Sequence, residues 1–461
     1  MKHFKYLLAV LALAAAFSCN KKLDVLPQNN VTDIQTGDDV VALLKGGYSL
    51  MQNASGFGEQ YIFISDLLAN SDQLLFVGTF TDYKDLTNKH QTKESAIATS
   101  IWENSYLLIE NMNIVLDKIS LVDEAEQPSI ASEARFMRGV AYYELINYFA
   151  QPYSAGNASS NPGVPLVLEP TYNYDSTKNK PSRASVEDVY QQILSDLIDA
   201  ANGLPATAEN ARATSYAAEA FLSRVYLNMG DYTNAATTAN DVIQSGNYSL
   251  TSTYNQAFNN PSNSTEDIFG IQQTAQSNAG TTNSGIVTFY RYAYDAQTNP
   301  QGGRGDAQVN PGYFNYFDDQ NDFRATFITY GYSTNFTDGI YTLKWLSFYK
   351  VIPVVRLAEM YLTRGEANLQ KGGSPIGGVS PEDDINIVRE RSDARDISSV
   401  TESDFVDERF RELAFEGDRL WTLKRLKLKV GNYTYDAPKL VLPIPQREID
   451  VNSNLTQNEG Y

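Results

Sequence analysis

Two glutamates near the C-terminus are spaced so that their carboxylates could act together in catalysis. Glu412 and Glu416 would share one face of a helix, and a carboxylate pair could do acid–base work on a sugar. The carboxylates of glycoside hydrolases, however, face the substrate from opposed walls, roughly 5 to 10 Å apart. Adjacent turns of one helix do not offer that arrangement, and Arg409, Arg411 and Arg419 surround the pair. The pattern predicts partly buried ion pairs, and we assign no catalytic residue.

The residue types give little support for a metal site or for a catalytic nucleophile. The chain has two histidines and one cysteine, which argues against His-based metal sites and against Ser–His or Cys–His nucleophiles. His90 stands in a polar stretch and is predicted to lie on the surface. Asp318, Asp319 and Asp322 lack the glycine and terminal glutamate of an EF-hand loop, so we expect a turn closed by Asp322 and Arg324. We predict no metal and no cofactor.

Aromatic side chains are the positive candidates for binding. The chain has 30 Tyr and 21 Phe, and their rings are flat and amphipathic. Sugar rings have apolar C–H faces that such rings can cover, while neighbouring polar groups bond the hydroxyls. Two loop stretches, 76–83 and 289–306, combine both kinds of side chain. The candidate ligand-binding residues in and beside them are Asp72, Phe76, Phe80, Tyr83, Tyr290, Tyr292, Tyr294 and Arg304.

The three tyrosines of the second stretch suggest a strand. Tyr290, Tyr292 and Tyr294 alternate along the sequence, so in a strand they would point to one face. That face could bind a ligand, or it could pack the strand onto the rest of the protein.

The N-terminus predicts export and lipidation. Positive charges precede an apolar run over 6–17, which is too short to span a bilayer as a helix. Small residues lead to Cys19, and this pattern resembles a bacterial lipobox, although Ala16 stands where Leu is usual. Two or more acyl chains on Cys19 would anchor the protein stably to a membrane. We expect a signal peptide over 1–18 and a lipidated N-terminus with a polar tether over 19–40; the alternative is a plain secreted protein.

Composition narrows the class of ligand. Hydrophobic residues make up 42% of the chain, so a folded core is expected. The 36 Lys and Arg against 55 Asp and Glu give a formal net charge of −19. That charge argues against nucleic-acid binding, which needs a basic surface. It favours neutral sugars or peptides over polyanionic ligands.

Helical periodicity dominates residues 41–249. The 3.6-residue period predicts helices over 102–119, 129–149 and 185–201, with Ser185 as the cap of the last. Residues 214–245 predict two helices separated by a Gly-Asp turn, a pattern that resembles a tetratricopeptide unit.

The remainder of the chain divides into a loop-rich insertion and a second helical part. Residues 250–352 lose the helical period and predict loops with short strands. Residues 353–461 predict helices over 353–371, 381–394 and 404–426, then an extended segment at 441–445. We therefore expect a mainly α-helical solenoid of tetratricopeptide-like helix pairs, with a loop-rich half that carries short β-strands.

Five segments along the chain have the character of family motifs. They are EARFMR at 133–138, PSR at 181–183, RLAEMYL at 356–362, ERFRELAFEGDR at 408–419 and LPIP at 442–445. In this order, over nearly the whole chain, they resemble the SusD/RagB family of outer-membrane lipoproteins of Bacteroidetes. One departure from the pattern is Leu420-Trp421-Thr422, where the family usually has an aromatic residue, a variable residue and Asp.

The resemblance implies a non-catalytic, surface-exposed lipoprotein that binds nutrients. Such proteins partner a SusC-like TonB-dependent transporter in the outer membrane; many bind oligosaccharides and some bind peptides. We expect this chain to capture oligosaccharides for such a transporter. The alternatives are a peptide-binding member, a structural adaptor for the transporter and, least favoured, a carboxylate-dependent glycoside hydrolase.

Overall fold

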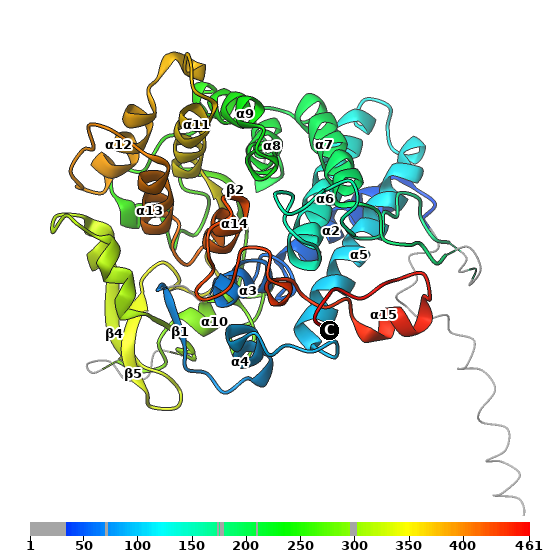
Figure 1. The fold of residues 1–461 in the computed structure, drawn as a ribbon. Coiled ribbons are helices and arrows are strands. Elements are labelled where there is room, and N and C mark those ends of the chain that lie inside the picture. Colours follow the sequence, from blue (N-terminus) through cyan, green and yellow to red (C-terminus); the bar gives the residue numbers. More distant parts are fainter. Residues whose placement is uncertain (1–33, 70–71, 173–174, 176–178, 209–210, 296–301) are drawn as a thin grey trace, which may run out of the picture.

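A computed structural model describes residues 34–461 except 70–71, 173–174, 176–178, 209–210 and 296–301 (Figure 1). The expected signal peptide, Cys19 and most of the expected tether lie outside the described residues. Regular structure in the described part is mostly helical, which confirms the expected fold class. No helix of that part combines the length and the apolar character needed to cross a membrane.

The N-terminal half is built of helices whose ends are set by local caps. α2 begins at Gly37, inside the segment expected as tether, because Thr36 and Asp39 form a capping box. Ser185 caps its helix by accepting a hydrogen bond from the backbone N–H of Asp188, as the sequence predicts. The helices are α2 (Gly37–Gln52), α3 (Gln60–Ala69), α4 (Thr81–Asn88), α5 (Ala96–Asp117), α6 (Gln127–Phe149), α7 (Val186–Gly203), α8 (Ser215–Met229) and α9 (Tyr232–Gln244).

The C-terminal half returns to helices after the loop-rich insertion. The α-helices are α10 (Ile286–Tyr290), α11 (Leu357–Lys371), α12 (Pro381–Arg391), α13 (Glu402–Glu412), α14 (Asp418–Arg425) and α15 (Gln446–Val451). Short 3-10 turns occur at Ile119–Leu121, Tyr254–Ala257, Pro311–Tyr316, Phe323–Thr326, Ile376–Gly378 and Pro438–Leu440.

Neighbouring helices pack side by side in a curved row. α5, α6, α7, α8 and α9 each contact the next, and α9 contacts α11, which contacts α12; in Figure 1 this row runs from the right across the top to the left. The α8–α9 pair turns at Gly230, whose φ of 76° is left-handed, and at Asp231, which caps α9. This pair confirms the predicted tetratricopeptide-like unit.

Among the described residues, three two-stranded antiparallel sheets lie in or beside the loop-rich half. β1 (Leu74–Phe76) pairs with β3 (Ala307–Val309), β2 (Asp267–Ile271) with β6 (Ile352–Arg356), and β4 (Ile328–Tyr332) with β5 (Asp338–Thr342). The expected helix over 353–371 was wrong in its first turn. Residues 352–356 form a strand because β2 supplies a partner from more than 80 residues earlier in the chain.

The single helix expected over 404–426 is interrupted. α13 ends at Glu412 and α14 begins at Asp418, with Gly417 between them in a left-handed conformation at φ 84°. A Cβ at Gly417 would lie 2.8 Å from the hydroxyl of Ser65, so α3 approaches this turn too closely for a larger residue. Packing against α3 thus requires a glycine at this turn.

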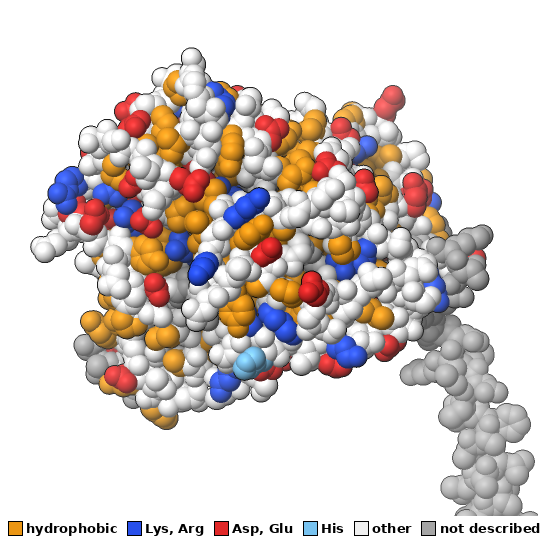
Figure 2. Space-filling model, in the orientation of Figure 1, with side chains coloured by type: hydrophobic (Ala, Val, Ile, Leu, Met, Phe, Trp, Pro, Cys, Tyr) orange, Lys and Arg blue, Asp and Glu red, His pale blue; other side chains and the backbone are white. Residues whose placement is uncertain are grey.

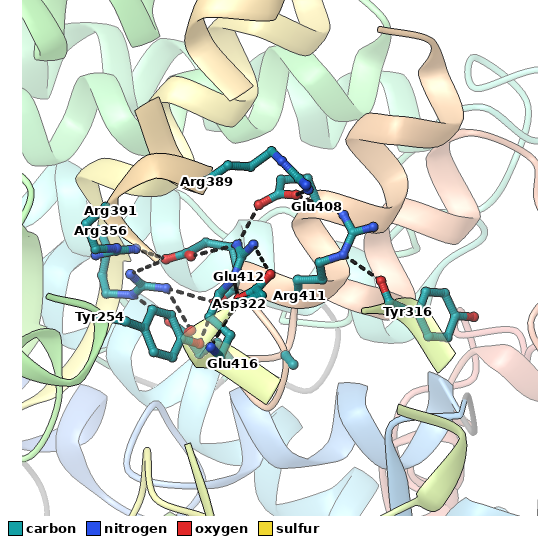
Figure 3. A network of polar contacts seen from close by, with 12 residues as sticks. Tyr254, Tyr316, Asp322, Arg356, Arg389, Arg391, Glu408, Arg411, Glu412 and Glu416 are labelled. Atoms are coloured by element: carbon teal, nitrogen blue, oxygen red, sulfur yellow. Dashed lines mark hydrogen bonds and ion pairs between the residues drawn. The ribbon is translucent and has the colours of Figure 1, made fainter. Parts of the chain in front are cut away.

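A buried charge network fastens the loop-rich half to α13 (Figure 3). Glu412, which is fully buried, accepts hydrogen bonds from Arg356 at 2.9 Å and from Arg324 at 3.3 Å, and it also pairs with Arg391. Glu416 accepts two bonds from Arg356, each of 2.8 Å. This confirms the ion-pair role predicted for Glu412 and Glu416. Their partners come from other parts of the chain, and not from the expected Arg409, Arg411 and Arg419.

The expected turn at 322–324 belongs to the same network. Asp322 accepts bonds from the backbone and the guanidinium of Arg324, which confirms that turn. Arg324 then reaches Glu408 of α13. His90 is exposed, also as predicted.

Candidate ligand-binding surface

One corner of the loop-rich half brings together several of the candidate residues. The backbone N–H of Arg304 donates to Thr288 at 2.7 Å, that of Thr334 donates to Arg304 at 2.8 Å, and that of Tyr332 donates to Tyr294 at 2.7 Å. These bonds tie the segment after α10 and the 302–306 turn to the β4–β5 hairpin. Figure 2 shows hydrophobic side chains gathered at the lower left, where Figure 1 places β4 and β5. We call this surface the aromatic corner, and define it as Phe80, Tyr292, Tyr294, Arg304, Tyr330, Tyr332 and Phe336.

Arg304 lies over an aromatic ring and is held there by a buried carboxylate. Its guanidinium carbon is 4.5 Å from the centre of the Phe80 ring, a distance typical of cation–π contact. Its Nε donates to Asp306 at 2.7 Å, and Asp306 is fully buried. Burial raises the pKa of Asp306, and Arg304 opposes that shift. Longer contacts of 3.4 Å join the other nitrogens to Asn283 and Thr79.

The β4–β5 hairpin exposes large aromatic rings. Phe336 and Tyr330 are 74% and 73% exposed. Phe336 stacks on Tyr294, with ring centres 5.4 Å apart and planes at 5°. Its backbone has a φ of 58°, a conformation that costs a bulky residue about 1–3 kcal/mol and that clusters at functional sites. An exposed, strained phenylalanine at a hairpin tip makes this surface a candidate for ligand binding.

Two candidate tyrosines lie in the core instead, so the structure does not support them as ligand contacts. Tyr290 is the last residue of helix α10, fully buried, and its hydroxyl donates to Asp66 at 2.6 Å. Tyr83 is 5% exposed and donates to the buried Glu59. Burial raises the pKa values of Asp66 and Glu59, each to about 7, and the tyrosine hydroxyls oppose the shift.

The predicted strand over 290–294 was also wrong. Residues 286–290 form a helical turn, and only Tyr294 pairs with a strand residue, Tyr332, through an isolated bridge. Alternation of tyrosines therefore did not place all three on one face. Tyr292 is half-buried and packs near Tyr341, with ring centres 6.0 Å apart.

Of the remaining candidates in and beside the first stretch, one belongs to the aromatic corner and two lie outside it. Phe80 is half-buried and belongs to it. Phe76 is half-buried between Phe63 and Tyr83, with ring centres 6.3 and 5.9 Å away. Asp72 is exposed. It lies beside Gly312, since a Cβ atom added to that glycine would be 2.7 Å from the Cβ of Asp72. The candidates that the structure brings together are Phe80, Tyr292, Tyr294 and Arg304.

Sequence reasoning missed three residues of the corner, Tyr330, Tyr332 and Phe336. Their segment reads TYGYSTNF, in which aromatic residues alternate with small ones. That alternation before the Asn-containing turn at 333–337 is the signal that could have found the hairpin.

Replacing Tyr290 by phenylalanine tests its reassignment to the core. Loss of the hydroxyl leaves the buried Asp66 with one bond fewer, so we expect the free energy of unfolding to fall by about 1–3 kcal/mol. Ligand affinity should stay within about twofold of wild type, a change of less than half a kcal/mol. Urea denaturation measures the first effect and calorimetric titration the second. The matched change Tyr330→Phe should leave stability unaltered, because that ring is exposed; a loss of affinity in Tyr290→Phe would restore Tyr290 to the site.

The fold places the chain among mainly α-helical proteins in which packed helix pairs support a loop-rich half. Residues 23–227 match the SusD-like family model described as "Starch-binding associating with outer membrane", and residues 349–461 match the model of the SusD family. Together the two matches cover more than half of the chain. The chain belongs to the SusD family, as its motifs predict.

Individual relatives span most of the chain at low identity. SusD-like protein P38 of Formosa agariphila is 24% identical, and the match covers 100% of both chains. The starch-binding protein SusD of Bacteroides thetaiotaomicron is 25% identical over 77% of this chain and 76% of its own length. A SusD superfamily crystal structure, also from Bacteroides thetaiotaomicron, superposes with a TM-score of 0.79 at 26% identity, covering 92% of this chain and 100% of the other.

Proposed function

We propose that this chain is a non-catalytic cell-surface lipoprotein that captures oligosaccharides and delivers them to a SusC-like TonB-dependent outer-membrane transporter. The observation that carries the proposal is the aromatic corner. Phe336 and Tyr330 leave about three quarters of their surface in water, and an apolar patch of that kind is typical of a binding site. Arg304 adds hydrogen-bond donors over the ring of Phe80, and donors beside an aromatic ring suit sugar hydroxyls above an apolar ring face.

Family membership supports the same reading. The matching family model is described as starch-binding and associated with the outer membrane, and one relative is a starch-binding protein. A lipid anchor at Cys19 would hold the protein at that membrane, with the aromatic corner free to meet ligands outside the cell.

The charge arrangement favours binding without turnover of a neutral ligand. The carboxylate of Asp306 next to the corner is buried and engaged by Arg304. Glu408 and Glu412 are sealed in the network on α13, fully buried. These carboxylates are engaged by arginines instead of facing a ligand from opposed walls, so we expect the sugar to leave unchanged.

Calorimetric titration with linear neutral oligosaccharides tests the function. We expect saturable binding, and the double change Tyr294→Ala with Phe336→Ala should weaken it about tenfold, since each ring contact is worth about 0.5–1.5 kcal/mol. Tyr433→Ala, at a tyrosine outside the corner, should bind as wild type does. Mass spectrometry of the recovered sugar should show its full length.

Two outcomes would count against the proposal. Shortened sugars would show an enzyme. Binding of short neutral peptides but of no oligosaccharide would instead identify a peptide-binding member of the family.

A further inference from the structure

A polar cavity lies in the centre of the molecule, away from the aromatic corner. Residues of α3, α6, α8, α11, α13 and α14 line it. The space open to the centre of a water-sized sphere is about 60 Å³, whereas one water needs roughly 10–15 Å³ of such space. The cavity therefore has room for only a few water-sized species, which excludes a sugar.

The charged side chains that line the cavity are paired, with one exception. Arg224 bonds both carboxylate oxygens of Glu359 at 2.6 Å. Arg409 pairs with Asp418. Arg425 pairs with Glu366 just behind the lining at 2.5 Å, and Glu416 is neutralised by Arg356 and Lys344.

Glu144 is the exception. It is 5% exposed, lines the cavity, and makes no hydrogen bond or ion pair with any residue that the structure describes. Arg224 is the charge that acts on it, but the guanidinium of Arg224 is already bonded to Glu359. Burial raises the pKa of Glu144 to about 8, with Arg224 opposing the shift. An unpaired buried carboxylate is costly unless a counterion or a proton neutralises it.

The walls beside Glu144 suit a small cation. Tyr143 lines the same cavity, and aromatic faces attract cations. The ring of Trp421 already carries the ammonium of Lys424, 5.4 Å from the ring centre. The hydroxyl of Tyr143 accepts a bond from Asn228 at 2.8 Å and keeps a second lone pair. No cluster of three or more acidic, His or Cys side chains suited to a metal occurs in the described part of the chain, which argues against a divalent ion.

A side hollow offers an entry path. It shares Asn228, Trp421 and Arg425 with the cavity and extends to Tyr153, which is only half-buried. The hollow is narrow, because the space open to the centre of a water-sized sphere is only about 10 Å³. It would therefore admit species no larger than water. Asn147, one turn beyond Glu144 on α6, lines this hollow with a buried side-chain nitrogen that lacks a protein partner.

We propose that this cavity is a binding site for a water-sized monovalent cation, ammonium or potassium, with the Glu144 carboxylate as its charged ligand. Where Glu144 is ionised, the ion balances the one unpaired charge of the cavity, and it fits the space and the path. The site is independent of the aromatic corner, so sugar binding and cation binding can fail separately.

Thermal unfolding in different chloride salts tests the proposal. At a pH just above 8 and equal ionic strength, we expect ammonium or potassium chloride to raise Tm by a few degrees, saturably, relative to choline chloride, whose cation is too large for the cavity. Glu144→Gln keeps the side-chain shape and should abolish the difference between salts. Glu94→Gln, a matched change at an exposed glutamate, should keep it. The response to ammonium against potassium distinguishes the two ions.

A second measurement covers the case in which Glu144→Gln does not fold. Crystals of the unaltered chain soaked in thallium(I), a heavy substitute for potassium, should show an anomalous peak in contact with the Glu144 carboxylate. Equal Tm values in all salts, a response retained by Glu144→Gln, or thallium bound only elsewhere would overturn the site. Each of those results would leave Glu144 as a protonated acid bonded to water.

Discussion

Replacing Glu412 by glutamine is expected to lower the free energy of unfolding by about 3–5 kcal/mol, the usual cost of removing one partner from a buried ion pair. Glu412 is fully buried and receives Arg356, Arg391 and Arg324. An amide keeps the shape of the side chain but leaves these guanidinium groups short of one negative charge in a medium that solvates them poorly. Urea denaturation, followed by circular dichroism, measures the loss.

The matched control is an exposed pair. Glu103 pairs with Arg447 at the surface, where their side chains are 45% and 66% exposed. Glu103→Gln should cost no more than about 1 kcal/mol, because water screens that pair. Equal losses in both variants would contradict the view that the network on α13 fastens the loop-rich half to the helices.

The same network sets the acid limit of stability. Burial by itself would raise the pKa of Glu412, but Arg391, Arg356 and Arg324 together lower it to about 2, below the value of about 4.3 for an unfolded glutamate. Because the folded pKa is lowered, this contribution is present above about pH 4.3 and is lost as pH falls toward 2. In Glu412→Gln, stability should therefore fall less steeply across that range than in the wild type.

Replacing Arg304 by alanine is expected to weaken oligosaccharide binding about thirtyfold, or about 2 kcal/mol, the size typical of a central contact. This prediction rests on the proposed function. Arg304 is fixed before the ligand arrives, since Asp306 accepts from its Nε and the ring of Phe80 lies beneath it. Donors held in place lose little freedom on binding, so each bond contributes more to affinity.

Arg304→Lys separates geometry from charge. Lysine keeps the positive charge but lacks the planar fork, so it cannot both lie flat on Phe80 and donate from two nitrogens; we expect binding at least about tenfold weaker than wild type, more than 1 kcal/mol. Arg447→Ala removes an exposed arginine elsewhere and should leave affinity unchanged. Wild-type affinity in Arg304→Ala would remove Arg304 from the site, and wild-type affinity in Arg304→Lys would show that its charge alone matters.

Local sequence determined the helices, their caps and the family. Ser185, Thr214 and Asp231 cap their helices through hydrogen bonds to residues only three positions along the chain. The 3.6-residue period of apolar residues also indicates which face of a helix is buried, whatever element packs against it. Hence α5 to α9 and α11 could be predicted. The ion-pair role of Glu412 and Glu416 was also predicted, but their arginine partners, Arg324, Arg356 and Arg391, come from other parts of the chain.

Tertiary structure alone decided which aromatic residues face water. Tyr290 and Tyr294 lie in the same short stretch of sequence, yet the first donates to Asp66 of α3 and the second stacks on Phe336 of the β4–β5 hairpin. Residues 352–356 became a strand because β2 lies beside them, and the close approach of α3 leaves no room for a residue larger than glycine at position 417. In each case the contacting residues are distant along the chain. A local sequence pattern cannot predict contacts that form only when the chain folds.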